Sequence, residues 1–128
     1  MQAITTPQAP LPGGHYSQAI VHGGLVFVAG QLPLDPARPG TPPPEGIEAQ
    51  TTLVLNHVEA ILAAAGSGLD RLLSVTIYVA NLAHWGQVNA IYSARLGAHR
   101  PARAVVPVPE LHFGALLEVQ AIAAVRGA

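Results

Sequence analysis

Alternation of apolar and polar positions predicts the strands of this chain. Residues 17–21 and 25–29 are two short, mostly apolar runs joined through Gly23-Gly24. This arrangement predicts a β-hairpin, because glycine accepts the positive φ angles of a tight turn. Residues 72–79 alternate aliphatic side chains with polar ones, which is typical of a strand with one face against helices. Two more strands are predicted over residues 102–106 and 116–125.

Two stretches between these strands follow a helical period instead. From about residue 46 to residue 65, apolar side chains recur at spacings near 3.6, Glu48 and Glu59 fall on the other side, and Gly66 ends the stretch. A second helix is predicted between Asn81 as its N-cap and Gly97 as its end. Its apolar stripe consists of Trp85, Val88, Tyr92 and Leu96.

The predicted order of elements is ββαβαββ, which indicates an α+β domain. Helices that alternate with strands cover one face of a mixed sheet. The other face carries many aliphatic residues, so it would need a partner chain to cover it. The proline- and glycine-rich residues 1–15 are expected to be an arm that is ordered only where it docks. Six prolines between Leu32 and Pro44 predict a surface loop within one domain that spans residues 1–128.

Composition narrows the classes of function. Half of the 128 residues are hydrophobic and 10% are charged, so a lone domain would expose apolar patches of the kind that mark association. The chain has no cysteine, which excludes thiol chemistry and disulfides. It also has no lysine and a net charge of −1, which argues against nucleic-acid binding. The lack of a long apolar run or of a signal peptide predicts a soluble, cytoplasmic protein.

Arg103 and Glu118 are the candidate reactive pair, placed fifteen positions apart on two predicted strands. A forked guanidinium matches a carboxylate bidentately, and a nearby carboxyl group can move a proton, so the pair could serve a small acid in one cleft. This requires that Arg103 is left partly unpaired. The alternative is an ordinary cross-strand ion pair between Arg103 and Glu118.

Other candidate chemistry is weaker. The six histidines show no ligand spacing, so no metal site is expected, and the paired glycines lack the context of a phosphate-binding loop. Tyr16 precedes the first predicted strand, where its hydroxyl could cap a cleft or its ring could pack as a half-buried aromatic.

Five motifs, in order, resemble the RidA/YjgF family of enamine and imine deaminases, also called the endoribonuclease L-PSP or translation initiation inhibitor family. They are Gly-His-Tyr-Ser-Gln-Ala at 14–19, Ala-Gly-Gln-Leu-Pro at 29–33, Val-Asn-Ala-Ile-Tyr at 88–92, Pro-Ala-Arg at 101–103, and Glu118 followed by Gln120-Ala-Ile-Ala. The resemblance covers residues 14 to 125.

The resemblance implies a chorismate-mutase-like fold assembled as a homotrimer, with sheets facing inward and clefts at the subunit interfaces. It implies hydrolysis of 2-enamino and 2-imino acids to 2-oxo acids and ammonia, without a cofactor or metal. Arg103 would bind the carboxylate with the backbone N–H of Val105, and Glu118 would hold water and shuttle protons. The remaining residues that it places at the cleft are Tyr16, Ala29, Gly30 and Asn89.

Some positions depart from the family pattern. Ala29 stands where serine is frequent, Val105 where cysteine is frequent, and His15 where proline is common. Two functions therefore stay open, an imine deaminase and a non-catalytic trimer that binds small carboxylates such as 2-oxo acids. Glu118 favours the enzyme, because a pure carboxylate-binding site gains nothing from a second negative charge. A ribonuclease role ranks third, since the charge balance is against it.

Overall fold

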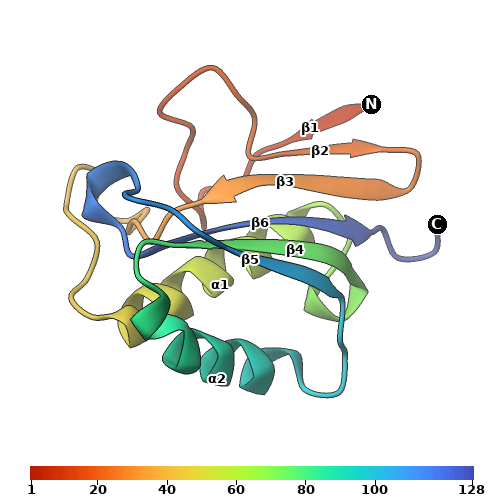
Figure 1. The fold of residues 1–128 in the computed structure, drawn as a ribbon. Coiled ribbons are helices and arrows are strands. Elements are labelled where there is room, and N and C mark those ends of the chain that lie inside the picture. Colours follow the sequence, from red (N-terminus) through yellow and green to blue (C-terminus); the bar gives the residue numbers. More distant parts are fainter.

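The computed structural model describes all residues, 1–128, as a six-stranded mixed sheet with both helices on one face (Figure 1). The strands follow the order β1-β2-β3-β6-β4-β5, and all neighbours are antiparallel except β4 and β5. This confirms the predicted α+β class. The bounds are β1 Gln2–Ile4, β2 Ala19–His22, β3 Leu25–Gln31, α1 Ile47–Ala64, β4 Leu72–Val79, α2 Trp85–Leu96, β5 Ala102–Pro107 and β6 Leu117–Ala124. Neither helix is long and apolar enough to cross a membrane.

The amino-terminal residues differ from the predicted arm. Residues 2–4 form β1, which pairs antiparallel with β2 at the sheet edge, so the observed order is βββαβαββ. The residues that follow dock on their own domain through Gln18, which is buried between them and the sheet. Its side chain accepts a hydrogen bond from the Thr6 N–H at 2.7 Å and donates to the carbonyl oxygens of Thr6 at 3.0 Å and Pro10 at 2.9 Å.

The core lies between the sheet and the two helices. Along β6, Leu117, Val119 and Ala121 are buried and alternate with residues of the opposite face. From α1, Val54, Val58, Ile61 and Leu62 fill the space above them. Asn81 caps a short 3₁₀ turn, Leu82–His84, by accepting from the Ala83 N–H at 2.9 Å, and this turn runs directly into α2. The predicted second helix therefore begins as a 3₁₀ turn, and Gly97 ends it at a φ of 62°.

The opposite face of the sheet has no helix over it (Figure 1). Phe27 of β3 is 42% exposed there, and Leu73 of β4 is 47% exposed. Ile122 of β6 lies directly opposite Phe27 in the strand register. An apolar sheet face left open in one chain is a surface suited to contact with another chain.

Candidate active site

Arg103 lies on the edge strand β5 and turns its side chain toward α2. Its Nη1 donates to Asn89 Oδ1 at 2.9 Å, and its guanidinium carbon lies 4.8 Å from the ring centroid of Trp85 and 5.0 Å from that of Tyr92. The ion pairs of the chain join Arg38 to Asp35, Arg95 to Glu59 and Arg126 to Asp70, and none involves Arg103. Its charge is therefore held in place by an amide and two rings while it is free to bind an anion.

A cavity of about 500 Å³ opens at this guanidinium. No carboxylate lines this cavity. Besides Arg103, its lining residues are Asn89, Tyr92, Ser93, Leu96, Gly97, His99, Arg100 and Pro101. A second arginine, Arg100, also lines the cavity and adds positive charge. The cavity is suited to one end of a small anion.

Glu118 lies on β6 and faces the open side of the sheet. It lines a separate cavity of about 520 Å³ with Tyr16, Ala29, Gly30 and His112. Burial raises the pKa of the Glu118 carboxyl, and positive charge on His112 partly offsets this effect. A carboxyl group whose pKa moves toward neutral pH is better suited to both accept and release a proton.

Gly30 makes room for the Glu118 carboxyl. A Cβ atom at this position of β3 would overlap the carboxylate oxygen of Glu118 and come within 3.1 Å of its carboxyl carbon. The absence of a side chain therefore lets the carboxyl group lie against the backbone of β3. Because Glu118 itself lies on a strand and not on a loop, the position of its carboxyl group is precisely defined.

Arg103 and Glu118 line two different cavities, so a cleft that contains both is not formed within one chain. β5 and β6 are not neighbours, because β4 lies between them. Arg103 pairs in register with the buried Val75 and faces the helices, whereas Glu118 alternates with the buried Leu117 and faces away from them. The ordinary cross-strand ion pair is excluded for the same reason. A ligand that contacts both groups must lie between two chains.

The other predicted residues fall into these two groups. Tyr16, Ala29 and Gly30 line the Glu118 cavity, and Tyr16 is 55% exposed, so its ring does not pack in the core. Asn89 belongs to the Arg103 group. Val105 lies two residues beyond Arg103 on the same side of β5, half-buried against the core, and it does not line the Arg103 cavity.

Sequence reasoning missed the aromatic support of Arg103 and the residues beside Glu118. Trp85 and Tyr92 were predicted as an apolar helix stripe, and they carry the guanidinium as well. A signal existed in the spacing, since Trp85, Asn89 and Tyr92 share one face of a helix. His112 and Phe113 carry no such signal, because they come from a short 3₁₀ turn between β5 and β6.

Comparison with known proteins finds the same fold and similar sequences. The family model described as endoribonuclease L-PSP matches residues 6–125. A RutC family protein of Pyrococcus horikoshii is 40% identical over 122 residues, which are 95% of this chain and 96% of that protein. The structure of RidA from a Psychrobacter species has a TM-score of 0.92 at 34% identity and covers 98% of this chain and 100% of its own. TdcF from E. coli, solved with bound serine, has a TM-score of 0.91 at 31% identity and covers 97% and 98%.

Proposed function

Because the chain belongs to the endoribonuclease L-PSP family, which includes the RidA/YjgF and RutC proteins, we propose that it hydrolyses 2-enamino and 2-imino acids to 2-oxo acids and ammonia. The reaction takes place in a cleft between neighbouring subunits of a homotrimer. One observation carries this proposal. An arginine without an ion pair and a carboxyl group of raised pKa line two separate cavities on opposite faces of the sheet.

Association of subunits is supported by the open sheet face. Phe27, Leu73 and Ile122 form an apolar surface that no element of the same chain covers. This uncovered face supports association with another chain, and the threefold number comes from the family resemblance alone. Rings of identical subunits are a common way to cover such a face.

Arg103 supplies the recognition of substrate. Its guanidinium group binds the substrate carboxylate through two N–H groups. Asn89 accepts a hydrogen bond from Nη1, and the rings of Trp85 and Tyr92 hold the guanidinium in place. The family resemblance adds the backbone N–H of Val105 as a second donor to the same carboxylate, although Val105 does not line the Arg103 cavity of one chain. TdcF was solved with serine, which is a small molecule with a carboxylate next to an amine-bearing carbon, and this supports ligands of that class.

Glu118 acts on the other end of the substrate. Its carboxyl group protonates the imine nitrogen, and the resulting carboxylate takes a proton from water as the water oxygen bonds to C2. The carbinolamine then receives that proton on nitrogen, the C2–N bond breaks, and ammonia leaves as the hydroxyl proton returns to Glu118. The products are a 2-oxo acid and ammonia, and the carboxyl group ends as it began. Positioning and one acid–base group suffice for this step.

The second candidate is a non-catalytic binder of small carboxylates. Ala29 favours it, because this residue lines the Glu118 cavity without the hydroxyl that the family often carries there. Glu118 favours the enzyme, since a half-buried negative charge beside a bound anion weakens simple binding. A nuclease is disfavoured by charge, because the chain has no lysine and three of its six arginines pair with carboxylates.

The test compares wild type, Glu118→Gln and the exposed control Glu45→Gln on an imine generated in situ by an amino-acid oxidase. Release of ammonia and 2-oxo acid is measured against the uncatalysed rate. We expect Glu118→Gln to lower kcat by about 10²- to 10⁴-fold, because it removes the titrating proton, while the control matches wild type. Binding of a 2-oxo acid to Glu118→Gln should be retained.

Each other result has a distinct meaning. Background rates for all three proteins together with 2-oxo acid binding would establish the binder. Acceleration by wild type and Glu118→Gln alike would remove Glu118 from the chemistry. A stable monomer in sedimentation at micromolar concentration would refute the cleft between subunits.

A further inference from the structure

A second cavity opens beside the Glu118 cavity and shares a wall with it. We call it the proline chamber, because its lining from residues 7–11, residues 34–42 and Phe113 includes five prolines. Its volume is about 690 Å³, which is larger than the 520 Å³ of the Glu118 cavity. Pro10, Leu11, Leu34 and Phe113 line both. The two cavities are therefore adjacent, with these four residues at their boundary.

The chamber wall is held in shape by α1. His57 of this helix is buried, and its Nε2 lies 2.6 Å from the carbonyl oxygen of Leu34. Burial lowers the pKa of His57, so the neutral ring donates this hydrogen bond from Nε2. Leu34 is part of the shared wall, and its backbone is thus tied to the core of the domain. Because this wall is already ordered in the free protein, ligand binding does not have to include the entropy cost of ordering the wall.

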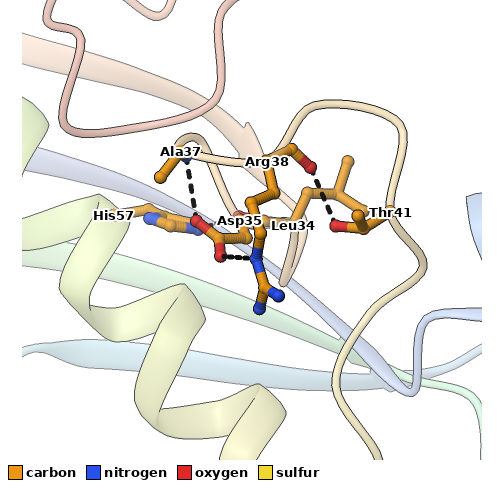
Figure 2. Close-up of polar contacts among 6 residues, drawn as sticks. All are labelled: Leu34, Asp35, Ala37, Arg38, Thr41 and His57. Carbon is orange, nitrogen blue, oxygen red and sulfur yellow. Dashed lines mark hydrogen bonds and ion pairs between the residues drawn. The ribbon is translucent and has the colours of Figure 1, made fainter.

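The charged groups of the chamber neutralise each other. Asp35 accepts from the Ala37 N–H at 2.9 Å and from Arg38 Nε at 3.1 Å, as Figure 2 shows. The Thr41 hydroxyl donates to the carbonyl oxygen of Arg38 at 2.8 Å and closes the loop. No unpaired charge is left to attract a polar side chain. The prolines and Leu11, Leu34 and Phe113 then set the character of the chamber as apolar.

The shared wall exposes two large apolar side chains. Leu11 is 65% exposed and Phe113 is 68% exposed. Phe113 is also the one residue other than glycine with a positive φ, at 62°. A bulky residue in this region of backbone space is strained, and such strain gathers at binding sites. Both side chains would lose contact with water when an apolar group enters the chamber.

We propose that the proline chamber binds an apolar side chain of the 2-imino or 2-oxo acid whose C2 lies at Glu118. The preferred ligands then carry several carbon atoms beyond Cβ, as do the acids derived from leucine or phenylalanine, and not a single methyl group. This inference rests on the proposed function for the placement of C2. The carboxylate is used by Arg103 and the imine by Glu118, so only the unreactive side chain is left to enter an apolar space. A methyl group would leave this space empty.

The first test measures kcat/KM for imines generated from alanine, leucine and phenylalanine. We expect kcat/KM for the leucine and phenylalanine imines to exceed that for the alanine imine by about 10-fold or more, as added methylenes in an apolar pocket do. Pro42→Glu places a charge in the chamber and should lower kcat/KM for the leucine imine by about 10-fold, with the alanine imine unchanged. Pro43→Glu is the control, since Pro43 belongs to the same loop and lines neither cavity.

The second test uses binding alone and separates this inference from the proposed reaction. Calorimetric titration compares pyruvate with 4-methyl-2-oxopentanoate. A lower Kd for the larger acid, lost in Pro42→Glu and kept in Pro43→Glu, supports the chamber even where no imine is hydrolysed faster than background. Equal kcat/KM values or equal Kd values for small and large ligands overturn the chamber and leave the proposed reaction standing.

Discussion

Replacing Arg103 separates a structural arginine from one that binds substrate. Within the chain, Arg103→Ala removes one hydrogen bond to Asn89, worth about 1 kcal/mol at an exposed position, and two cation–π contacts of about 0.5–1 kcal/mol each. The free energy of unfolding should therefore fall by about 2–3 kcal/mol. Folded domains have about 5–15 kcal/mol in total, so the variant should still fold.

Arg103→Ala should also weaken the binding of a carboxylate ligand, by an amount that the lost stability of the fold does not explain. A bidentate, charge-assisted contact to a carboxylate contributes about 3 kcal/mol or more, so Arg103→Ala should weaken the binding of a 2-oxo acid by about 100-fold or more. Arg103→Lys keeps the charge and loses the fork, so it should fall between the two, about 10-fold below wild type. Calorimetric titration gives the Kd, and thermal unfolding gives the stability.

Arg95→Ala is the matched control for this experiment. Arg95 lies on α2 and donates hydrogen bonds to Asn56 at 2.9 Å and Glu59 at 3.2 Å, so its removal costs similar contacts away from the cavity at Arg103. We expect wild-type binding from Arg95→Ala. Wild-type binding from Arg103→Ala, or failure of Arg103→Ala alone to fold, would refute the role of Arg103 as the carboxylate receptor.

The remaining predictions concern the position and protonation of single groups. Gly30→Ala should lower kcat by about 10-fold or more in a folded protein, since a methyl group there displaces the Glu118 carboxyl; wild-type kcat would contradict this. kcat should decline as the pH rises through the pKa of Glu118, because the reaction begins with its protonated carboxyl group; the midpoint should lie above the ordinary 4.5 because burial raises this pKa, and a midpoint at or below 4.5 would count against Glu118 as the acid. The free energy of unfolding should fall as the pH drops below about 6.5, because His57 stays neutral in the fold and takes up a proton in the unfolded chain. His57→Gln, which keeps a donor for the Leu34 carbonyl, should lose this part of the pH dependence, whereas the exposed control His22→Gln should keep it.

Long periodic segments could be predicted from sequence. The predicted strand over residues 72–79 coincides with β4, and the helix predicted over about 46–65 matches α1 at Ile47–Ala64. β1 could not be predicted, because its three residues are too few to show an alternation. Its pairing with β2 depends on the hydrogen bonds of the Gln18 side chain to Thr6 and Pro10, which hold the amino-terminal residues at the sheet edge. These are tertiary contacts.

Candidate residues could be named from sequence, but their arrangement in space could not. Arg103 and Glu118 each line a cavity, but their spacing in sequence says nothing about a third strand between them. Strands that follow each other in sequence usually pair, so β5 would be expected beside β6. In the structure β4 lies between them. The proline chamber was also outside the reach of sequence, because it brings together residues 7–11, the proline loop and Phe113.

The placement of Arg103 and Glu118 on opposite faces has a genetic consequence. In the proposed ring each cleft takes its arginine from one chain and its carboxyl group from the next, so two inactive proteins can complement each other. When Arg103→Ala and Glu118→Gln chains are unfolded and reassembled together in equal amounts, about three quarters of the trimers contain both, and each of these has one cleft with both groups intact. About a quarter of all clefts would thus regain wild-type chemistry. An organism carrying one such defect on each of two gene copies would keep the activity that either copy alone has lost.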